Sequence, residues 1–596
     1  MEEIPEDPEL RRAWNRLALA MEQPEVFYTH EWAVAVHRAF GDVRKPLLLL
    51  AYENQLLVGV VALTREKERR AEASFLAAST ADYCDFLSHP EHRTQFVEAV
   101  LRELQIREID SLVLTNLPVD SCSLPALSAA ASNCHYNLYK RSAYHCARVV
   151  LGTPEQRAAL KVATVSKKRL RRNLRELQKR GRVCFRHDTH WDEIEPRLRP
   201  FNRAHVARFL STGRISNLIR AERRKFLYEL AHELSFSSWL TLSSLFVGDV
   251  PVAWNYGFQF PGSWFWYQPT VHSGHEYSDF SPGYCLLAQI VEQACDRPEV
   301  DVVDLGLGAE EYKERFATAA RETLCCVLTR SFTRHLRKVT REWAAASARS
   351  AGLENMLRIA ISSVARGRAR LRETGIRGLL TTLGRQLCAS VYSHEKVIFF
   401  EWAAQEAKRD RKTKLAPLDP ELLGEAAILY ADDPASTQFL MRSAQRFRLE
   451  PIQGFVLVTA EGTPVHFCWV AEFERFRMAE LNRILHAPSP DAVMIFDCFT
   501  PNPIRGRGFF GETITALAEQ LRAEGKAPWI FSAEANKRSL RGIAKSGFTY
   551  RFFCVRKKIL FSEKTEDSMD NLQAKHDNSV TARSTDCQKG NDKNLS

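Results

Sequence analysis

Residues 494–521 read MIFDCFTPNPIRGRGFFGETITALAEQL, and this stretch decides the fold of the C-terminal part of the chain. The apolar run that ends at Thr500 predicts a strand, and a Pro-rich turn leads from it into the loop Arg505-Gly506-Arg507-Gly508. The apolar residues after the loop recur every three or four positions and therefore predict a helix with one apolar face: Phe510, Ile514, Leu517 and Leu521.

The loop at the start of this helix has the chemistry of an anion-binding site. Glycine lets backbone N–H groups approach a ligand closely, and a helix N-terminus favours negative charge. Two arginines add positive charge. We therefore predict that a pyrophosphate binds to Arg505, Gly506, Arg507, Gly508 and Phe509.

This strand, loop and helix resemble motif A of the GNAT superfamily of acyl-CoA N-acyltransferases, whose pattern is Q/R-x-x-G-x-G/A. Arg505 and Gly508 match the pattern, whereas Phe510 stands where the last Gly or Ala is expected. The resemblance implies an acyl-CoA cosubstrate, such as acetyl-CoA, and no metal.

A second segment supports the same resemblance. The strand PWIFSAEA is followed by Asn536, Ser539 and Gly547-Phe548, which resembles the N-x-x-(A/S)…GF pattern of the family. Asn536 therefore joins the predicted cofactor-binding residues. Ile543 replaces the tyrosine that serves the family as general acid toward the leaving thiolate.

Transfer from acyl-CoA to an amine needs a base, a donor to the thioester oxygen and a fixed pyrophosphate. The resemblance places the donor, a backbone N–H, near Phe499 or Thr500. The candidate bases are carboxylates on or beside the predicted strands, each with the alternative of a solvated carboxylate at a strand edge: Asp497, Glu472, Glu474 and Glu534.

The first half of the chain contains a different set of motifs. They are FYTHEW (27–32), GVVALT (59–64), SKKRLRRNLRELQKRG (166–181), FSPG (280–283) and DLGLGAEEYK (304–313). Together with Asp82 and Asp85, they resemble the acetyltransferase family first linked to cellulose and exopolysaccharide biosynthesis, which is similar in fold to the Fem-type aminoacyl transferases. The resemblance runs from about Phe27 to Phe316 and implies two GNAT-like halves packed as one unit.

Two junctions in this half repeat the chemistry of the C-terminal loop. Ser281 and Gly283 flank Pro282 at a predicted helix start, where Ser281 is expected to cap the helix and free N–H groups to face a ligand. Lys313 is expected to pair with a phosphate or a substrate carboxylate. Tyr267, Asp304 and Glu311 are acid–base candidates, but DLGLG also fits a tight strand–helix turn in which Asp304 is only a cap.

The predicted fold class is α/β, with several GNAT-like modules built on mixed, mostly antiparallel sheets flanked by helices. The predicted divisions are two GNAT-like halves, a basic helical linker, a C-terminal GNAT domain and a disordered tail: 1–150, 151–330, 331–390, 391–561 and 562–596.

Composition excludes several classes of protein. The 596 residues are 45% hydrophobic and 26% charged, an ordinary globular balance. The sequence has no uncharged apolar run long enough to span a membrane, and its acidic start is unlike a signal peptide. The 14 cysteines are scattered and do not show the spacing of a zinc site. We expect a cytoplasmic protein.

Positive charge is concentrated in two segments. Residues 161–182 hold ten Lys/Arg and one acid, and residues 331–386 hold twelve and three, so each carries +9 while the whole chain carries +11. Each segment fits contact with tRNA, an anionic membrane or a polyanionic glycan, or simply the solvated face of an amphipathic helix.

The function predicted from these patterns is transfer of an acyl group from acyl-CoA to an amine of a cell-envelope or polysaccharide precursor, for example a small-molecule or sugar-nucleotide acceptor. Two alternatives remain at this point. One is Fem-type transfer from aminoacyl-tRNA, and the other is a GNAT-fold protein that binds a ligand without catalysis. The oligomeric state is not predicted.

Overall fold

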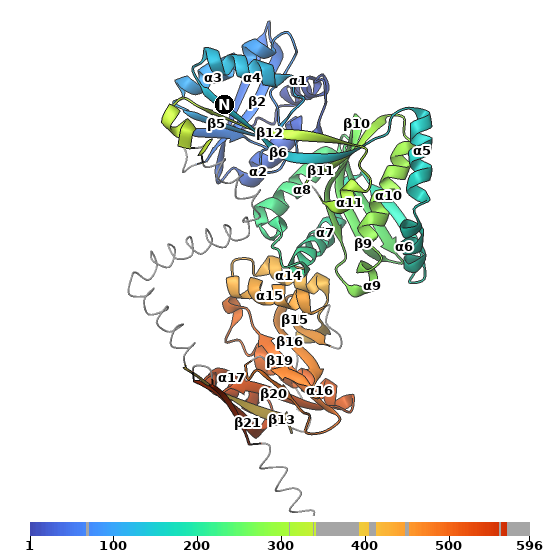
Figure 1. The fold of residues 1–596 in the computed structure, drawn as a ribbon, viewed down its shortest axis with the longest axis vertical. Coiled ribbons are helices and arrows are strands. Elements are labelled where there is room, and N and C mark those ends of the chain that lie inside the picture. Colours follow the sequence, from blue (N-terminus) through green and yellow to red (C-terminus); the bar gives the residue numbers. More distant parts are fainter. Residues whose placement is uncertain are drawn as a thin grey trace, which may run out of the picture. The chain divides into compact units, whose positions relative to one another are not determined.

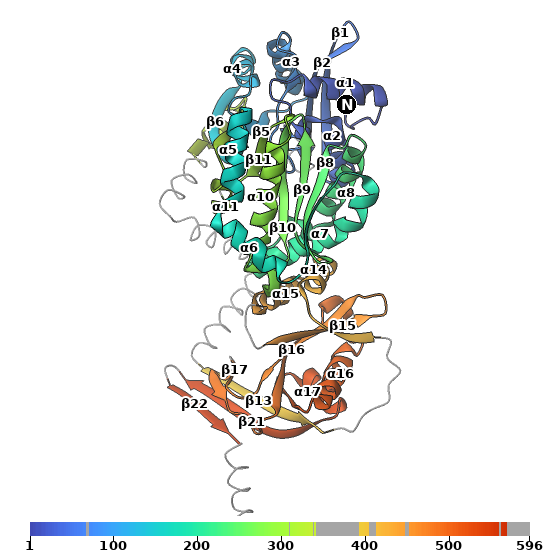
Figure 2. The same ribbon diagram turned by 90° about the vertical axis from the view of Figure 1, so that its right-hand side faces the viewer.

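The computed structural model describes residues 1–66, 71–308, 310–337, 339–340, 392–403, 413–447, 452–478, 480–559 and 562–568. Contacts divide the chain into two compact units, Met1–Ala351 and Gly352–Ser596. Each unit is a mixed sheet flanked by helices, as Figures 1 and 2 show, which confirms the predicted α/β class. None of the described helices combines the length and apolar character that crossing a membrane requires.

The described part of the first unit is built on one 12-stranded sheet. The strand order is β1-β2-β3-β5-β12-β6-β11-β10-β9-β8-β7, and β4 pairs with β2. The strands are β1 (Arg44–Glu53), β2 (Leu56–Glu66), β3 (Glu72–Phe75), β4 (Leu87–Ser88), β5 (Ser111–Pro118), β6 (Asn137–Val150), β7 (Val183–Asp188), β8 (Leu240–Val247), β9 (Val250–Phe260), β10 (Gly262–Val271), β11 (Val300–Leu307) and β12 (Ala319–Thr329).

Helices cover both faces of this sheet. In the second half, α10 lies on one face and α7 on the other (Figures 1 and 2), and the apolar side of α10 packs on the strands through Leu286, Leu287 and Ile290. The helices are α1 (Pro8–Leu19), α2 (His30–Phe40), α3 (Arg93–Ile106), α4 (Ser123–Asn133), α5 (Pro154–Val165), α6 (Lys168–Gln178), α7 (Trp191–Ser211), α8 (Ala221–Ser235), α9 (His275–Ser278), α10 (Pro282–Cys295) and α11 (Glu311–Glu314).

Each half of the first unit contains a parallel strand pair connected by a helix. The last strand of each half pairs with a strand of the other half. In the first half β3 and β5 are parallel with α3 between them in sequence, and in the second half β10 and β11 are parallel with α10 between them. The last strand of the second half, β12, pairs with β5, and the last strand of the first half, β6, pairs with β11. Because β6 and β12 also pair with each other, the sheet runs unbroken through the predicted boundary at residue 150.

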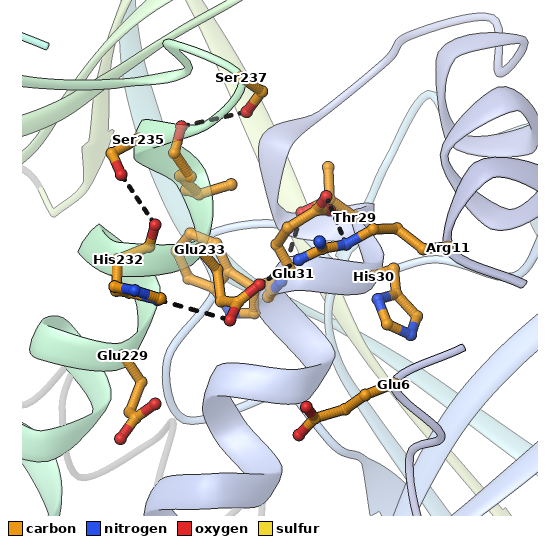
Figure 3. Close-up of polar contacts among 12 residues, drawn as sticks. Glu6, Arg11, Thr29, His30, Glu31, Glu229, His232, Glu233, Ser235 and Ser237 are labelled. Carbon is orange, nitrogen blue, oxygen red and sulfur yellow. Dashed lines mark hydrogen bonds and ion pairs between the residues drawn. The ribbon is translucent and has the colours of Figure 1, made fainter. Parts of the chain in front are cut away.

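A group of buried and half-buried charges also joins the halves. Figure 3 shows Arg11 of α1 between Glu31 of α2 and Glu233 of α8. Arg38 of α2 adds ion pairs with Glu233 at 2.9 Å and with Glu229 at 3.0 Å. Since α1 and α2 belong to the first half and α8 to the second, these contacts hold the two halves in one orientation.

The second unit contains an 8-stranded sheet among its described residues, in the order β14-β15-β16-β19-β20-β13-β21-β22, and a small β17–β18 ladder. Its elements are β13 (Tyr392–Trp402), β14 (Thr413–Pro417), α14 (Pro420–Leu429), α15 (Pro434–Arg446), β15 (Gln453–Thr459), β16 (Pro464–Glu472), β17 (Phe476–Met478), β18 (Arg483–Leu485), β19 (Ala492–Phe499), α16 (Phe509–Ala523), β20 (Ala527–Ala533), α17 (Lys537–Lys545), β21 (Phe548–Ile559) and β22 (Ser562–Asp567).

The predicted disorder of the tail is wrong for its first residues. The tail predicted to be disordered from residue 562 begins as a strand, since β22 pairs with β21 in antiparallel register. An exposed diagonal ion pair crosses the two strands, with Lys557 Nζ 3.8 Å from Glu566 Oε2. The rest of the predicted tail, 569–596, and most of the predicted linker, 341–390, lie outside the described residues.

Candidate active sites

A cleft of about 610 Å³ lies in the first unit where its two halves meet. Both halves contribute to it: Thr80, Asp82, Thr115 and Asn116 come from the first half, and Arg223, Tyr267, Gln268 and Leu307 from the second. The exchanged strands also reach it, through Arg141 and Tyr144 of β6 and Cys325 of β12.

The cleft forms because two parallel strand pairs separate at this point. The last paired residues of β10 and β11 are Phe265 and Asp304, and the strands diverge beyond them. Likewise β3 ends at Phe75 whereas β5 continues to Pro118. The residues that follow each point of separation line the cleft, so it lies where two openings in one continuous sheet face each other.

Asp82 is the carboxyl group that lines this cleft. Its side chain accepts a hydrogen bond from the backbone N–H of Leu307, and it is 8% exposed. Burial, together with the nearby charge of Asp304, raises the pKa of Asp82 to about 7, although Lys313 and Arg223 favour the ionised form. A carboxyl group with this pKa can take up or release a proton near neutral pH.

Tyr267 and Arg223 lie together in the same cleft. The Tyr267 hydroxyl donates a hydrogen bond to Thr80 O and accepts one from Arg223 Nη2 at 3.0 Å. Burial raises the pKa of Tyr267 to about 12, so its hydroxyl keeps its proton at neutral pH. The structure therefore brings this predicted acid–base residue to the cleft as a neutral hydrogen-bonding group.

Asp304, the other acid–base candidate of this half, is fully buried behind the cleft. Its carboxylate accepts hydrogen bonds from Tyr83 Oη (2.8 Å) and Gly306 N (2.8 Å) and forms an ion pair with Arg148 Nε (3.1 Å). With these partners Asp304 fixes the turn at the end of β11 and the position of β6. This matches the second interpretation of the DLGLG motif, a tight turn held by its first residue.

The start of α10 carries the predicted residues Ser281 and Gly283. Ser281 occupies the N-cap position, but it has a left-handed backbone (φ 48°) and its side chain does not cap the helix. Its Oγ instead lies 3.2 Å from Arg169 Nη2. A Cβ on Gly283 would lie 2.9 Å from Val271 Cγ1, so this glycine packs closely on the end of β10.

Cations of the basic segment 161–182 gather around this helix start. Lys167 Nζ lies 4.5 Å from the centroid of the Phe316 ring, and Arg180 Cζ lies 4.2 Å from that of Phe280. Since Arg169 reaches Ser281, α6 adds positive charge to the positive end of the α10 dipole. Arg171, Arg172 and Arg175 are exposed on the same helix.

Lys313 is 4% exposed and is engaged with its own segment. Its Nζ donates to Leu307 O at 2.9 Å and pairs with Glu310 Oε2 at 3.1 Å. Lys313 thus caps the end of β11 beside the cleft instead of presenting a free ammonium group to a phosphate. Glu311, in contrast, is exposed and pairs with Arg315 at 2.5 Å.

A second cleft of about 610 Å³ lies within the second unit and again follows the separation of a parallel pair. The last paired residues of β19 and β20 are Ile495 and Ile530. Asp497 lies just beyond, in a β-bulge opposite β16, with φ 47°. Its carboxylate pairs with Arg446 Nη1 at 2.5 Å, so this predicted base lines the cleft as one partner of an ion pair.

The other carboxylate candidates differ in position. Glu472 is exposed at the end of β16 and lines the second cleft. Glu474 lines it too, but its oxygens are bonded to His486 Nδ1 (3.0 Å) and Ala487 N (2.8 Å). Glu534 follows β20 and pairs with Lys396 Nζ at 2.9 Å, outside the residues that line the cleft.

The predicted pyrophosphate loop is exposed and open. Gly506 and Gly508 have φ angles of 84° and 87°, and no atom lies within 4 Å of a Cβ built on either residue. Arg505 and Arg507 are exposed, and Phe509 begins α16. The space beside both glycines at the start of α16 is therefore open, which fits a bound diphosphate.

Two departures from the GNAT pattern have structural consequences beside this loop. Phe510 lines the second cleft and packs against α17, since a Cβ on Gly542 would lie 2.8 Å from its ring. Its side chain therefore occupies the space between α16 and α17 that a small residue would leave open. Asn536 caps α17 by accepting a hydrogen bond from Ser539 N at 3.1 Å, while Ile543 is buried in the core.

Comparison with known families identifies the class of the second half of the first unit. Residues 165–314 match the family model described as an acetyltransferase (GNAT) domain. This range contains β10, α10 and β11, the elements that open the first cleft. These residues are thus similar to a GNAT domain, and the match covers 150 of the 596 residues. No curated protein matches the chain significantly.

Three solved structures that resemble part of the chain are FemX, L-PGS and a tandem GNAT protein. The structure of FemX is 8% identical and covers 55% of this chain and 98% of its own, with a TM-score of 0.39. L-PGS from Bacillus licheniformis is 10% identical, with coverages of 56% and 94% and a TM-score of 0.35. A tandem GNAT protein from the clavulanic acid biosynthesis pathway is 14% identical, with coverages of 54% and 95% and a TM-score of 0.32.

Asp82 and Arg223 are the residues of the first cleft that the sequence patterns did not assign to a role. Asp82 appears in the sequence only as part of a family resemblance, and Arg223 lies in a helical stretch with many charges. Both side chains are buried, at 8% exposure each, and their position in the cleft distinguishes them from Asp85 and Glu233, which are buried in the same segments but do not line it. Among the described residues, no cluster of His, Cys, Asp and Glu is arranged to hold a metal ion.

Proposed function

We propose that the protein is an acyl-CoA-dependent N-acyltransferase whose reaction takes place in the cleft of the first unit. The observation that carries this proposal is the cleft itself, which opens at the β10–β11 separation inside the region similar to a GNAT domain and is lined by Asp82. The acceptor is an amine of a small molecule or sugar nucleotide destined for the cell envelope or a polysaccharide, met in the cytoplasm. The sequence motifs of the first half favour the cellulose and exopolysaccharide branch.

Asp82 acts as the base in this proposal. An amine must lose a proton before it attacks the thioester carbonyl that acyl-CoA supplies, and a carboxylate within hydrogen-bonding reach removes that proton. Since the pKa of Asp82 is about 7, a substantial fraction of the group is ionised at neutral pH. The N–H of Leu307 and the turn at Gly306 hold the carboxylate at the point where β10 and β11 separate.

The substitution Asp82→Asn tests this role. We expect kcat/KM for acetyl transfer from acetyl-CoA to an amino-sugar acceptor to fall about 100-fold or more, the usual range for loss of a general base. The wild-type rate should rise with pH through about 7, because the ionised form of Asp82 is the active one. That dependence should disappear in the variant.

Asp85→Asn is the matched control. Asp85 is also buried and lies in the same segment, but its carboxylate is bonded to Ser121 Oγ and Phe86 N and does not line the cleft. This variant should keep the pH profile of the wild type whatever its stability. A wild-type pH profile in Asp82→Asn would refute the assignment of the base.

The loop at the start of α16 supports a second acyl-CoA site in the second unit. We infer that its N–H groups and the two loop arginines hold the pyrophosphate, since Gly506 and Gly508 leave the space free. Gly508→Glu would place a negative charge there and should abolish acyl-CoA binding to this unit. Gly525→Glu is the matched control, because it changes a left-handed glycine (φ 78°) just beyond the other end of α16 and should leave binding unchanged.

Aminoacyl transfer from tRNA is the second candidate function. One observation favours it, namely that α6 exposes Arg171, Arg172 and Arg175 to solvent. Neutralising these three arginines should then abolish a strongly salt-dependent tRNA affinity. Wild-type protein that binds acetyl-CoA but shows no such affinity would exclude this candidate. The contact predicted for 331–386 falls largely outside the described residues.

A further inference from the structure

Arg223 is a buried cation without a carboxylate partner. It lies on α8, is 8% exposed and lines the cleft of the first unit. Its guanidinium donates to Ser79 O (Nη1, 3.2 Å) and to the Tyr267 hydroxyl (Nη2, 3.0 Å), and Nε has no hydrogen-bond partner. Both of its hydrogen-bond partners are neutral, and it forms no ion pair within 4.0 Å with a described carboxylate. Asp82 interacts with it through charge alone.

This arrangement is costly unless an anion completes it. A buried charge is ordinarily paired, because neutral partners compensate only part of the hydration energy that burial removes. The other buried Arg and Lys side chains described in this unit follow the rule: Arg321 pairs with Glu25 at 2.5 Å, Arg93 with Glu22 at 2.8 Å and Lys313 with Glu310 at 3.1 Å. Arg223 departs from it at a place where a ligand has room to enter.

The immediate surroundings are shaped to hold the guanidinium toward the cleft. The Phe226 ring lies 5.1 Å from Arg223 Cζ, and the carbonyl of Ser79 and the hydroxyl of Tyr267 fix the two Nη atoms. Tyr267 is itself fixed by Thr80 O. The side chain is therefore preorganised, and an oxyanion that binds to it gains charge-assisted hydrogen bonds without ordering a flexible arginine.

We propose that Arg223 binds an oxyanion of the acceptor, a carboxylate or a phosphate, and so selects acceptors that carry a negative charge close to the amine. That the oxyanion belongs to an acceptor rests on the proposed function, but the anion site itself does not depend on it. Arg223 and Asp82 line the same cleft, so the anion and the amine of one small molecule occupy it together. Neutral amines of the same size bind less well.

The test measures anion binding by the full-length protein in the absence of acyl-CoA. Inorganic phosphate and acetate, titrated at constant ionic strength against chloride, are the probes, and thermal stabilisation and calorimetric titration are the readouts. We expect at least one probe to stabilise the wild type. Arg223→Met should weaken that binding about tenfold or more, as loss of a charge-assisted contact does. The stronger probe identifies the anion as phosphate or carboxylate.

Lys225→Met is the matched control, since it removes one positive charge from the same helix at an exposed position. It should bind the probe as the wild type does. Where Arg223→Met fails to fold, Arg223→Lys provides the test, because lysine keeps the charge but not the fixed fork of donors and should show weaker binding. Equal binding by wild type and by a folded Arg223 variant overturns the proposal, and so does a wild type that neither probe stabilises.

The experiments distinguish failure of the Arg223 anion site from failure of the proposed acyltransferase function. If acetyl-CoA does not bind but Arg223-dependent anion binding is present, the anion site stands and the acyltransferase proposal fails. If acetyl transfer occurs and kcat/KM for charged and neutral amines responds equally to Arg223→Met, the acyltransferase proposal stands and this inference fails.

Discussion

Among single residues, Gly306 determines the position of the Asp82 carboxyl group in the cleft. Its φ angle is 70°, and a Cβ on this residue would lie 2.7 Å from Asp82 Oδ2 and 3.3 Å from Trp266 O. Only glycine therefore lets β11 turn here while Asp82 stays in place. The GLG sequence after Asp304 indicates a tight turn, but it does not reveal that a carboxylate from residue 82 lies against it.

Gly306→Ala should combine backbone strain with displacement of Asp82. We expect a loss of about 1–2 kcal/mol in the free energy of unfolding from the left-handed backbone and, in addition, a large fall in acetyl-transfer activity. Gly248→Ala is the matched control, since Gly248 has a similar φ of 61° and no atom within 4 Å of its Cβ position. The control should lose similar stability and keep its activity. Equal activities of Gly306→Ala and Gly248→Ala would show that acetyl transfer does not depend on the position of Asp82.

His466 gives the second unit a defined pH dependence. Burial lowers its pKa to about 3, while Nδ1 is paired with Thr500 Oγ1 at 2.7 Å and Nε2 has no partner. The unfolded chain binds a proton at its ordinary pKa of about 6.5, so stability is lost as the pH falls below that value. His466→Gln should reduce the loss between about pH 7.5 and about pH 5 by about 2 kcal/mol. Calorimetry of the two proteins measures it, and parallel stability curves would contradict the assignment.

At the scale of helices and strands, the sequence predicts the order of the elements but not all of the strand pairings. Strand–helix–strand order in residues 494–533 follows from apolar spacing and glycines, and the structure has β19, α16 and β20 there. The same holds for β10, α10 and β11. The pairing of β12 with β5 is not predicted by the sequence, because any apolar strand can occupy that position next to β5. Only the complete fold selects β12 for it.

The exchange of β6 and β12 makes a prediction about fragments. In residues 1–150 alone, β5 would expose the edge that β12 covers in the intact unit. We expect this fragment to aggregate or stay unfolded, whereas residues 1–340, which include β12, should fold. Circular dichroism and size-exclusion chromatography distinguish these outcomes. A folded, monomeric 1–150 fragment would show that the halves are independent.

At the scale of the whole molecule, the proposed active site is built from residues that are distant in sequence. Asp82, Arg223 and Leu307 meet in one cleft only because two halves share a continuous sheet. Sequence patterns find glycine-rich junctions and strand order, since these are local. They miss the roles of Asp82 and Arg223, since the cleft that brings these two side chains together results from packing between the halves.

Two clefts in separate units are candidates for the proposed acyl transfer. Each cleft follows the separation of a parallel strand pair. In the second unit the bulge carboxylate Asp497 is paired with Arg446, and Phe510 occupies the space between two helices. In the first unit Asp82 has no such ion pair and lies inside the cleft. These differences favour the first unit as the site of chemistry.

Hydrogen–deuterium exchange of the full-length protein, with and without acetyl-CoA, tests most directly whether the first unit holds the acyl donor. We predict that acetyl-CoA slows exchange in the residues where β10 and β11 separate, 266–284 and 304–308, and that Asp82→Asn leaves this protection in place while it abolishes transfer. Acetyl-CoA binding that protects only the second unit, or no binding at all, would contradict this claim.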